Sequence, residues 1–311
     1  MKLISTLMML VFMTCGSTFA AADKSILMTD ELLSGMKLRN IGPAYMSGRI
    51  ADIAVDNKDP STWYVAVGSG GVWKTDNAGI TWKPIFDSQA VYSTGDVTID
   101  PSNSNIIWVG TGENSGGRHI SFGDGVYRSL DGGLTWKNMG LSQSEHISDI
   151  SGHPTDSTTV WVSSQGPHWS KGGQRGLFKT TDGGETWDNV LKTDEWTGVT
   201  SLVIDSRNPD KLYAATWQRQ RTLPAFVGTG PGSAIYTTED GGQTWRKLTE
   251  GLPKTDMGKI GLAISAINPC PLYTFDPADV LLLLQPGWRR FLKHKHKQLN
   301  KYINKTKKIH T

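Results

Sequence analysis

Residues 129–136 read Ser-Leu-Asp-Gly-Gly-Leu-Thr-Trp, and this stretch decides the fold of the 311-residue chain because it recurs. Related octapeptides occupy residues 75–82, 180–187 and 238–245, and the closing tryptophans are 54, 51 and 58 residues apart. A pattern that returns at this period is typical of propellers and other arrays, in which each repeat forms one supersecondary unit. The sequence is therefore that of a repeat protein.

The chemistry of the octapeptide favours a structural role. An aspartate side chain accepts hydrogen bonds from backbone amides one to three residues further on, and the Gly-Gly pair supplies the positive φ angles that close a hairpin. The tryptophan is expected to pack under this turn. We predict structural Asp-box residues, and no catalytic group, at Asp76, Trp82, Asp131, Trp136, Asp182, Trp187, Asp240 and Trp245.

Each repeat divides into four short strand-like pieces bounded by turn residues. In the first repeat these pieces are residues 49–55, 63–67, 71–74 and 81–85. The turn between the first and second piece of every repeat contains a proline, which fixes φ and removes a donor that no strand ladder needs. These prolines are Pro60, Pro101, Pro154 and Pro209.

Four strands per repeat make one blade, so we predict an all-β fold, a β-propeller of four-stranded blades with Asp-box hairpins. A fifth blade starts at residues 254–276, but neither a third strand nor an Asp box is expected after Asp276. Residues 277–311 are expected to form a basic, disordered tail outside the repeat. The four complete blades are predicted at residues 47–90, 91–142, 143–195 and 196–253.

The N-terminus has the layout of a cleaved secretory signal, since Lys2 precedes an apolar run at residues 3–13 and small residues follow. We predict a signal peptide at residues 1–22 and an N-terminal lead-in at 23–46. A run of about twelve apolar residues is too short to cross a hydrocarbon core of roughly 30 Å, which argues against a single-span anchor. The protein is thus expected to be exported, either periplasmic or secreted.

Charge is unevenly distributed along the chain. Nine of its 32 lysines and arginines follow residue 288, and without these and Lys2 the chain has 22 basic against 29 acidic residues. An acidic body argues against nucleic acid as a partner. The tail offers leucines at 281–284 and cations for a membrane surface, but we favour an unstructured tail because four leucines anchor weakly.

The octapeptide has the pattern Ser/Thr-x-Asp-x-Gly-x-Thr-Trp of the Asp-box or BNR repeat. Residues 39–253 resemble exported bacterial propellers of the sortilin-like or BNR-repeat glycosyl hydrolase-like family, with further support from residues 39–43, 110–114, 123–127 and 251–253. The resemblance implies a ring of about seven blades, within the usual range for propellers. We therefore expect this chain to be a truncated propeller.

Long connections between second and third strands are expected on the face opposite the Asp boxes, at residues 113–124, 165–175 and 218–233. Their aromatic and arginine side chains suit a carbohydrate or a peptide, because rings stack on sugar C–H surfaces and arginine forks hold carboxylates. The alternative is that the loops are merely solvated and that Trp169 and Trp217 pack between blades. The candidate ligand-binding residues are Glu113, Asn114, Arg118, His119, His168, Trp169, Arg175, Trp217, Arg219 and Arg221.

Two functions remain open. We favour a non-catalytic module that binds a peptide, a glycan or another exported protein. The alternative is a glycoside hydrolase acting on polysaccharide, which needs two carboxyl groups beside the scissile bond, and Glu113 and Asp124 are the candidates. The resembled two-propeller xyloglucan hydrolases carry a catalytic aspartate ahead of the first Asp box, and the matching position here is Gly68.

No metal and no cofactor is expected. The histidines lack the spacing of a zinc motif, and the Asp-Gly-Gly turns lack the ligand series of a calcium loop. Neither a nucleophile elbow nor a phosphate-binding loop is present in the sequence.

Overall fold

The computed structural model describes residues 48–264, 271–276 and 280–282. The predicted signal peptide, the lead-in and most of the predicted tail lie outside the described residues. By its internal contacts the chain divides into two units, Met1–Ala44 and Tyr45–Thr311, and the described residues all belong to the second.

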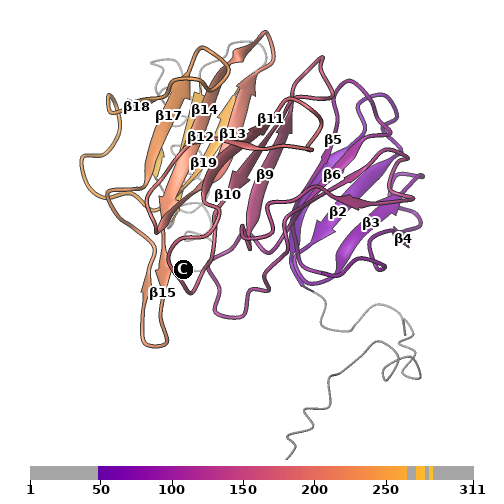
Figure 1. The fold of residues 1–311 in the computed structure, drawn as a ribbon, viewed down its shortest axis with the longest axis horizontal. Coiled ribbons are helices and arrows are strands. Elements are labelled where there is room, and N and C mark those ends of the chain that lie inside the picture. Colours follow the sequence, from indigo (N-terminus) through magenta and orange to yellow (C-terminus); the bar gives the residue numbers. More distant parts are fainter. Residues whose placement is uncertain (1–47, 265–270, 277–279, 283–311) are drawn as a thin grey trace, which may run out of the picture. The chain divides into compact units, whose positions relative to one another are not determined.

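The described residues form antiparallel sheets, each built from strands that follow one another in the sequence (Figure 1). The predicted all-β fold of four-stranded blades is confirmed for blades 1 to 4. Blade 1 contains β1 (Ile50–Val55), β2 (Trp63–Val67), β3 (Gly71–Thr75) and β4 (Lys83–Pro84). Blade 2 contains β5 (Thr94–Ile99), β6 (Ile107–Thr111), β7 (Val126–Ser129) and β8 (Lys137–Asn138). Blade 3 contains β9 (Ile147–Gly152), β10 (Val160–Ser164), β11 (Gly176–Thr180) and β12 (Asp188–Leu191). Blade 4 contains β13 (Thr197–Asp205), β14 (Asn208–Gln218), β17 (Ala234–Thr238) and β18 (Arg246–Leu248).

Blade 5 has three strands in the described part of the chain. They are β19 (Lys259–Ile264), β20 (Pro271–Asp276) and β21 (Val280–Leu282). The expectation that no third strand follows Asp276 is wrong, because β21 pairs antiparallel with β20 through Tyr273 and Leu282. The first part of the predicted tail therefore belongs to a blade.

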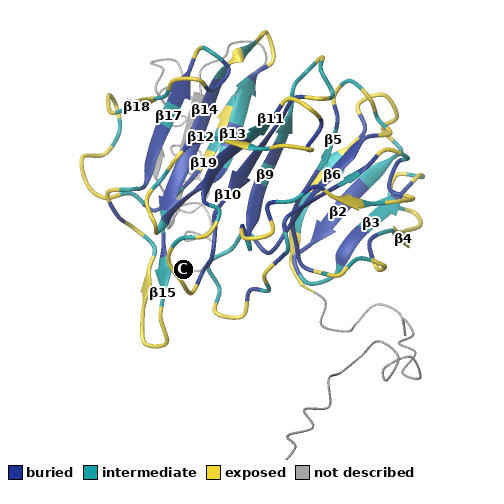
Figure 2. Cartoon of the chain, viewed as in Figure 1, coloured by how far each residue is buried: buried dark blue, intermediate teal, exposed yellow. Residues whose placement is uncertain are grey.

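The hydrophobic core consists of layers between successive blades. The first strand of each blade contacts the first strand of the next, from β1 through β5, β9 and β13 to β19. In Figure 2 the second and third strands of the blades are largely buried, and the turns are exposed. The short fourth strands β4 and β8 are exposed as well. The layer between blades 2 and 3 consists of apolar side chains, since Trp108 and Val126 of one sheet cluster with Ile147 and Phe178 of the other.

The Asp-box turn is held by its own side chains. In blade 2 the Oδ1 atom of Asp131 accepts hydrogen bonds from the N–H groups of Leu134 and Thr135, at 3.0 and 2.8 Å. Leu134 lies three residues on, as predicted, and Thr135 one residue further, because Gly132 and Gly133 have positive φ and turn the chain back over the carboxylate. The corresponding bonds to a threonine four residues on are made by Asp182 and Asp240.

The assignment of Asp76 to the Asp box of blade 1 is wrong. Asn77 fills the position, and its Oδ1 atom accepts a hydrogen bond of 2.9 Å from the N–H of Thr81. Asp76 instead is exposed and forms an ion pair of 3.2 Å with Lys74. The physical reason is the register of the octapeptide, in which the third residue holds the turn and the second points to solvent.

The tryptophans of the Asp boxes also connect neighbouring blades. The indole N–H of Trp136 donates to the carbonyl of Ile85 in blade 1 at 2.8 Å, and that of Trp187 donates to the carbonyl of Met139 in blade 2 at 2.8 Å. These bonds fix blades 2 and 3 against the preceding blade, whereas Trp245 of blade 4 donates to the carbonyl of Gly242 in its own Asp box.

The Asp boxes share a face with the turns between first and second strands, as predicted. Gly132 of the Asp box in blade 2 donates a hydrogen bond of 2.9 Å to the carbonyl of Asn105 in that turn, and Gly183 of blade 3 donates likewise to Thr158. In blade 4 Gly241 donates to the carbonyl of Asp210, which lies in β14. Pro209 differs from the prediction, because it lies inside β14 and the turn of blade 4 is Ser206–Arg207. Within the described residues, no helix is long and apolar enough to cross a lipid bilayer.

Candidate functional site: the loop face

The connections between second and third strands lie at the opposite ends of the blades, which we call the loop face. It comprises residues 68–70, 112–125, 165–175 and 219–233. The last connection carries the small hairpin of β15 (Gln220–Arg221) and β16 (Phe226–Val227), which projects beyond blade 4 in Figure 1.

Glu113 joins blades 1 and 2 at this face. Its side chain is buried, one oxygen forms an ion pair with the guanidinium of Arg49, and the other accepts a hydrogen bond of 2.9 Å from the hydroxyl of Ser69. A Cβ atom added at Gly68 would lie 3.1 Å from Cγ of Glu113. The Glu113 side chain therefore lies directly beside the position where the resembled hydrolases carry an aspartate.

Asp124, the second candidate carboxylate, is engaged within blade 2. The phenol of Tyr127 donates to its Oδ2 atom at 2.7 Å, and the hydroxyl of Thr111 donates to Oδ1 at 3.4 Å. Burial, together with hydrogen bonding to Asp124, raises the pKa of Tyr127 to about 12, so the phenol stays protonated and remains a donor. Glu113 and Asp124 thus each hold partners with both oxygens.

Arg219 and Arg221 reach from blade 4 to the loop of blade 2. Arg219 is 1% exposed, and it donates from Nη1 to the carbonyl of Ser115 at 2.9 Å and from Nη2 to the carbonyl of Gly166 at 3.2 Å. Arg221 is partly exposed and donates from Nη2 to the carbonyl of Gly116. Two loops far apart in the sequence are therefore held together by arginine side chains.

Arg175 holds the loop of blade 3 in shape. Its guanidinium donates to the carbonyls of Gln165 at 2.5 Å and Ser170 at 2.9 Å, and also to that of Pro167. Burial lowers the pKa of Arg175 to about 10 and that of Arg219 to about 9, and the charge of Arg175 lowers the latter further. Two of the predicted ligand-binding arginines are thus buried in the loops.

An aromatic group lies next to these arginines. Trp169 is 45% exposed and Phe226 is 40% exposed, and the buried His168 ring contacts both, at centroid distances of 5.8 and 6.0 Å. Burial, followed by the charges of Arg219 and of a second arginine, lowers the pKa of His168 to about 4, so this ring is neutral near pH 7.

Trp217 is buried, and its indole N–H donates to the carbonyl of Gly228 in the loop of its own blade at 2.7 Å. Asn114 is also internal, with its amide donating to the carbonyl of Gly95 at 3.0 Å. Arg118 and His119 are exposed on the blade 2 loop. Of the ten predicted ligand-binding residues, Trp169, Arg118 and His119 are exposed, whereas the others are buried or partly buried.

Three aspartates on the first strands escaped the sequence analysis. Asp52, Asp96 and Asp149 each accept a hydrogen bond from the first strand of the following blade, as Asp96 Oδ2 does from the N–H of Ile150 at 3.0 Å. The signal in the sequence is an aspartate directly before isoleucine or valine in the first strand-like piece of three repeats.

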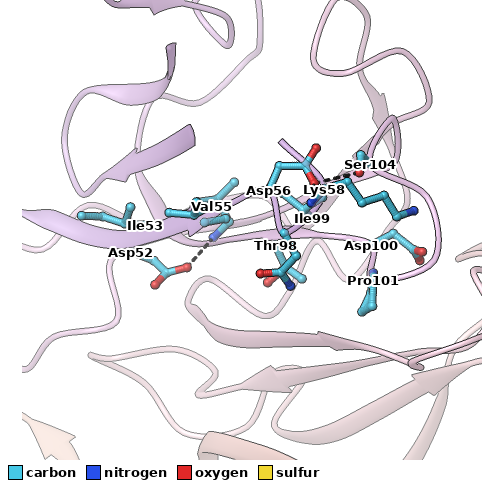
Figure 3. A pocket seen from close by; sticks show the side chains of 13 residues that line it. Asp52, Ile53, Val55, Asp56, Lys58, Thr98, Ile99, Asp100, Pro101 and Ser104 are labelled. Carbon is cyan, nitrogen blue, oxygen red and sulfur yellow. Dashed lines mark hydrogen bonds between the residues drawn. The ribbon is translucent and has the colours of Figure 1, made fainter. Parts of the chain in front are cut away.

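One cavity lies beside these strands, between β1 and β5. It measures about 250 Å³, and Asp52, Lys58, Thr98 and Asp100 are among its lining residues (Figure 3). Its lining includes the turn residue Pro101, which places it toward the Asp-box ends of the blades and away from the candidate ligand-binding residues.

Among the described residues, no cluster of three or more histidine, cysteine, aspartate or glutamate side chains is arranged to hold a metal ion.

Comparison with known proteins identifies relatives of limited identity. The family described as Sortilin, neurotensin receptor 3 (Sortilin-Vps10) matches residues 124–266. A xyloglucanase of Paenibacillus sp. is 24% identical over 220 residues, which cover 64% of this chain and 20% of the relative. A xyloglucanase of Hypocrea jecorina is 25% identical over 205 residues, which cover 63% of this chain and 21% of the relative. The chain thus spans about a fifth of the length of these relatives.

Solved structures show the same fold. An ancestral GH74 enzyme superimposes with a TM-score of 0.58 at 17% identity, over 75% of this chain and 31% of that enzyme. The GH74 xyloglucanase from Xanthomonas campestris gives a TM-score of 0.54 at 21% identity, over 74% of this chain and 35% of the enzyme. Together with the Asp boxes and the four-stranded blades, these matches show that the chain is a BNR-type β-propeller similar to sortilin-like and glycosyl hydrolase-like propellers.

Proposed function

We propose that the loop face binds a polysaccharide chain, as the carbohydrate-holding part of a propeller of the glycoside hydrolase type. The observation that carries the proposal is the pair of exposed rings, Trp169 and Phe226, which both contact the ring of His168. Exposed rings in a fixed position stack on the C–H faces of sugars at little entropic cost. The sequence analysis left a peptide, a glycan and another exported protein open as ligands, and the names of the relatives support a glycan.

Hydrolysis is the less favoured function of these blades. A glycosidase needs one carboxyl group as acid and another as base or nucleophile. Glu113 suits the role of base or nucleophile better than that of acid, because a carboxylate paired with a guanidinium is stabilised in its charged form. Asp124 is bound by Tyr127 inside blade 2, so we propose binding as the contribution of these blades.

Isothermal titration of the full chain with xyloglucan and other neutral β-glucan oligosaccharides tests the proposal. Each stacked ring contributes about 1 kcal/mol, so the Trp169→Ala, Phe226→Ala double variant should bind roughly tenfold to thirtyfold more weakly. Leu134→Ala is the matched control, because Leu134 is 83% exposed on the Asp-box face. A folded wild-type chain that binds no polysaccharide, or a double variant that binds as well as wild type, would refute the proposal.

A further inference from the structure

Three arginines on the loop face carry positive charge without a carboxylate partner. Arg175 and Arg219 are buried, Arg221 is partly exposed, and the ion pairs of the described residues all involve other side chains. A buried charge costs several kcal/mol of desolvation, which backbone carbonyls offset only in part. The charges of Glu145 and Asp194 act on Arg175, and that of Glu145 acts on Arg219, but neither carboxylate forms an ion pair with them. The three side chains therefore form a region of positive charge that is compensated only in part.

The three guanidinium groups lie close together. Arg175 and Arg219 donate to the carbonyls of adjacent residues, Gln165 and Gly166, in the loop of blade 3. Arg219 and Arg221 donate to the carbonyls of adjacent residues in the loop of blade 2, as described above. The loops therefore hold the arginines side by side although like charges repel. This repulsion is already present in the protein without a ligand.

Buried polar atoms without a hydrogen-bond partner lie at the same place. The Nε atom of Arg219 has no hydrogen-bond partner among the described residues, although its side chain is 1% exposed. Nδ1 of His146, whose ring centroid lies 6.2 Å from that of His168, is also unpartnered within this part of the chain. Leaving a buried donor unpaired is unfavourable, and an anion accepting from the guanidinium groups would remove part of the cost.

We propose that this arginine cluster binds a carboxylate group of the glycan, so that the loop face selects an acidic polysaccharide that contains uronic acid residues. The inference rests on the proposed function and specifies its ligand class. A uronic acid offers an apolar ring face together with a planar carboxylate, and the guanidinium of Arg221 lies 4.2 Å from the centroid of the exposed Phe226 ring. Stacking and the bidentate hydrogen bonding of an arginine fork would thus act on one sugar unit.

Matched ligands test this selectivity in the full chain. We would titrate oligosaccharides of galacturonan, glucuronoxylan and alginate, each against the same oligosaccharide after chemical reduction of its carboxyl groups. At least one acidic form should bind about tenfold or more tightly than its reduced counterpart, because a charge-assisted pair is lost on reduction. If no acidic form exceeds its reduced counterpart, the inference is wrong.

Variants assign the effect to the cluster. Arg221→Gln should remove the preference for the acidic form, and Arg221→Lys should keep only part of it because lysine lacks the fork. Arg246→Gln on the exposed strand β18 is the control and should keep the full preference. Arg221 is only partly buried, so its variants avoid the folding risk of changing Arg219; retention of the preference in folded Arg221→Gln would overturn the assignment.

The outcomes separate this inference from the proposed function. If the acidic and reduced forms bind equally and Trp169→Ala weakens this binding, the polysaccharide proposal holds and the acidic ligand is rejected. Absence of binding to every glycan rejects both. Binding of inorganic phosphate or sulfate alone, lost in Arg221→Gln, would show a small-anion site and reject the uronic acid.

Discussion

The carboxyl group of Asp149 accepts a hydrogen bond of 2.7 Å from the backbone N–H of Leu202, which ties the first strand of blade 3 to that of blade 4. Asp96 makes the equivalent bond from blade 2 to blade 3. Burial raises the pKa of Asp149 to about 7, with the Asp52 carboxyl adding to the effect, and raises the pKa of Asp96 well above its ordinary value. The blades are thus joined through protonated carboxyl groups, and the fold loses stability when these groups ionise.

Stability should therefore fall as pH rises from about 4 to about 7. An acid whose pKa is raised by folding binds more protons in the folded than in the unfolded chain, so the free energy of unfolding decreases through this window. We expect a loss on the order of a few kcal/mol, measured by urea unfolding with tryptophan fluorescence. Asp149→Asn should flatten the curve, and Asp188→Asn, at an exposed position of β12, should not. An unaltered slope in Asp149→Asn would count against this origin.

Ala78→Gly should stabilise the protein. Ala78 has a φ of 54° in the Asp box of blade 1, where the other blades have glycine, for example Gly132 with a φ of 69°. The left-handed conformation costs a non-glycine residue about 1–2 kcal/mol, and the larger entropy of the unfolded glycine chain offsets part of this, so we expect a net gain of about 0.5–1 kcal/mol. Urea unfolding measures it. Ala90→Gly, at an exposed turn position without positive φ, should give no gain, and an equal gain there would refute the explanation.

Asp131→Ala and Asp76→Ala should differ in effect although both residues belong to Asp-box octapeptides. Hydrogen bonds from Thr135, and then from Ser129, lower the pKa of Asp131 to about 2. A lowered pKa stabilises the fold above about pH 4, and this contribution is lost as pH falls toward 2. Asp131→Ala should lower the thermal unfolding midpoint at pH 7 and make it less sensitive to acid, and Asp76→Ala should change neither. Equal melting of the two variants would contradict the assignment of Asn77 to the turn.

The fold could be predicted because its signals are local. The octapeptide at 129–136 contains both the glycines and the aspartate of its hairpin, and Pro101 marks the preceding turn. Local chemistry also explains the error at Asp76, since the sequence offers an acidic residue next to the asparagine that makes the bonds. Strand β21 escaped prediction because a three-residue strand has no pattern of its own and depends on pairing with β20.

The candidate site was harder to predict because burial in loops depends on contacts between distant segments. The sequence indicates which loops are long, and three of them do carry the aromatic and arginine side chains. It does not indicate that Arg219 reaches Ser115, 104 positions away, or that Arg175 folds back onto its own loop. From the sequence alone, an exposed side chain that contacts a ligand therefore looks the same as a buried side chain that supports a loop.

Glu113→Gln should separate binding from hydrolysis. Both oxygens of Glu113 are engaged between blades 1 and 2, so we expect the affinity for polysaccharide to stay within about twofold when the charge is removed, as for an ion pair with a half-exposed arginine. Release of reducing ends by the purified chain is expected to disappear in this variant if Glu113 acts as base or nucleophile, whereas Asp124→Asn should retain it. Titration and a reducing-end assay on the same preparations provide the two readouts. Undiminished hydrolysis in Glu113→Gln would exclude Glu113 from the chemistry, and a tenfold or greater loss of affinity, about 1.4 kcal/mol, would instead make it a binding residue.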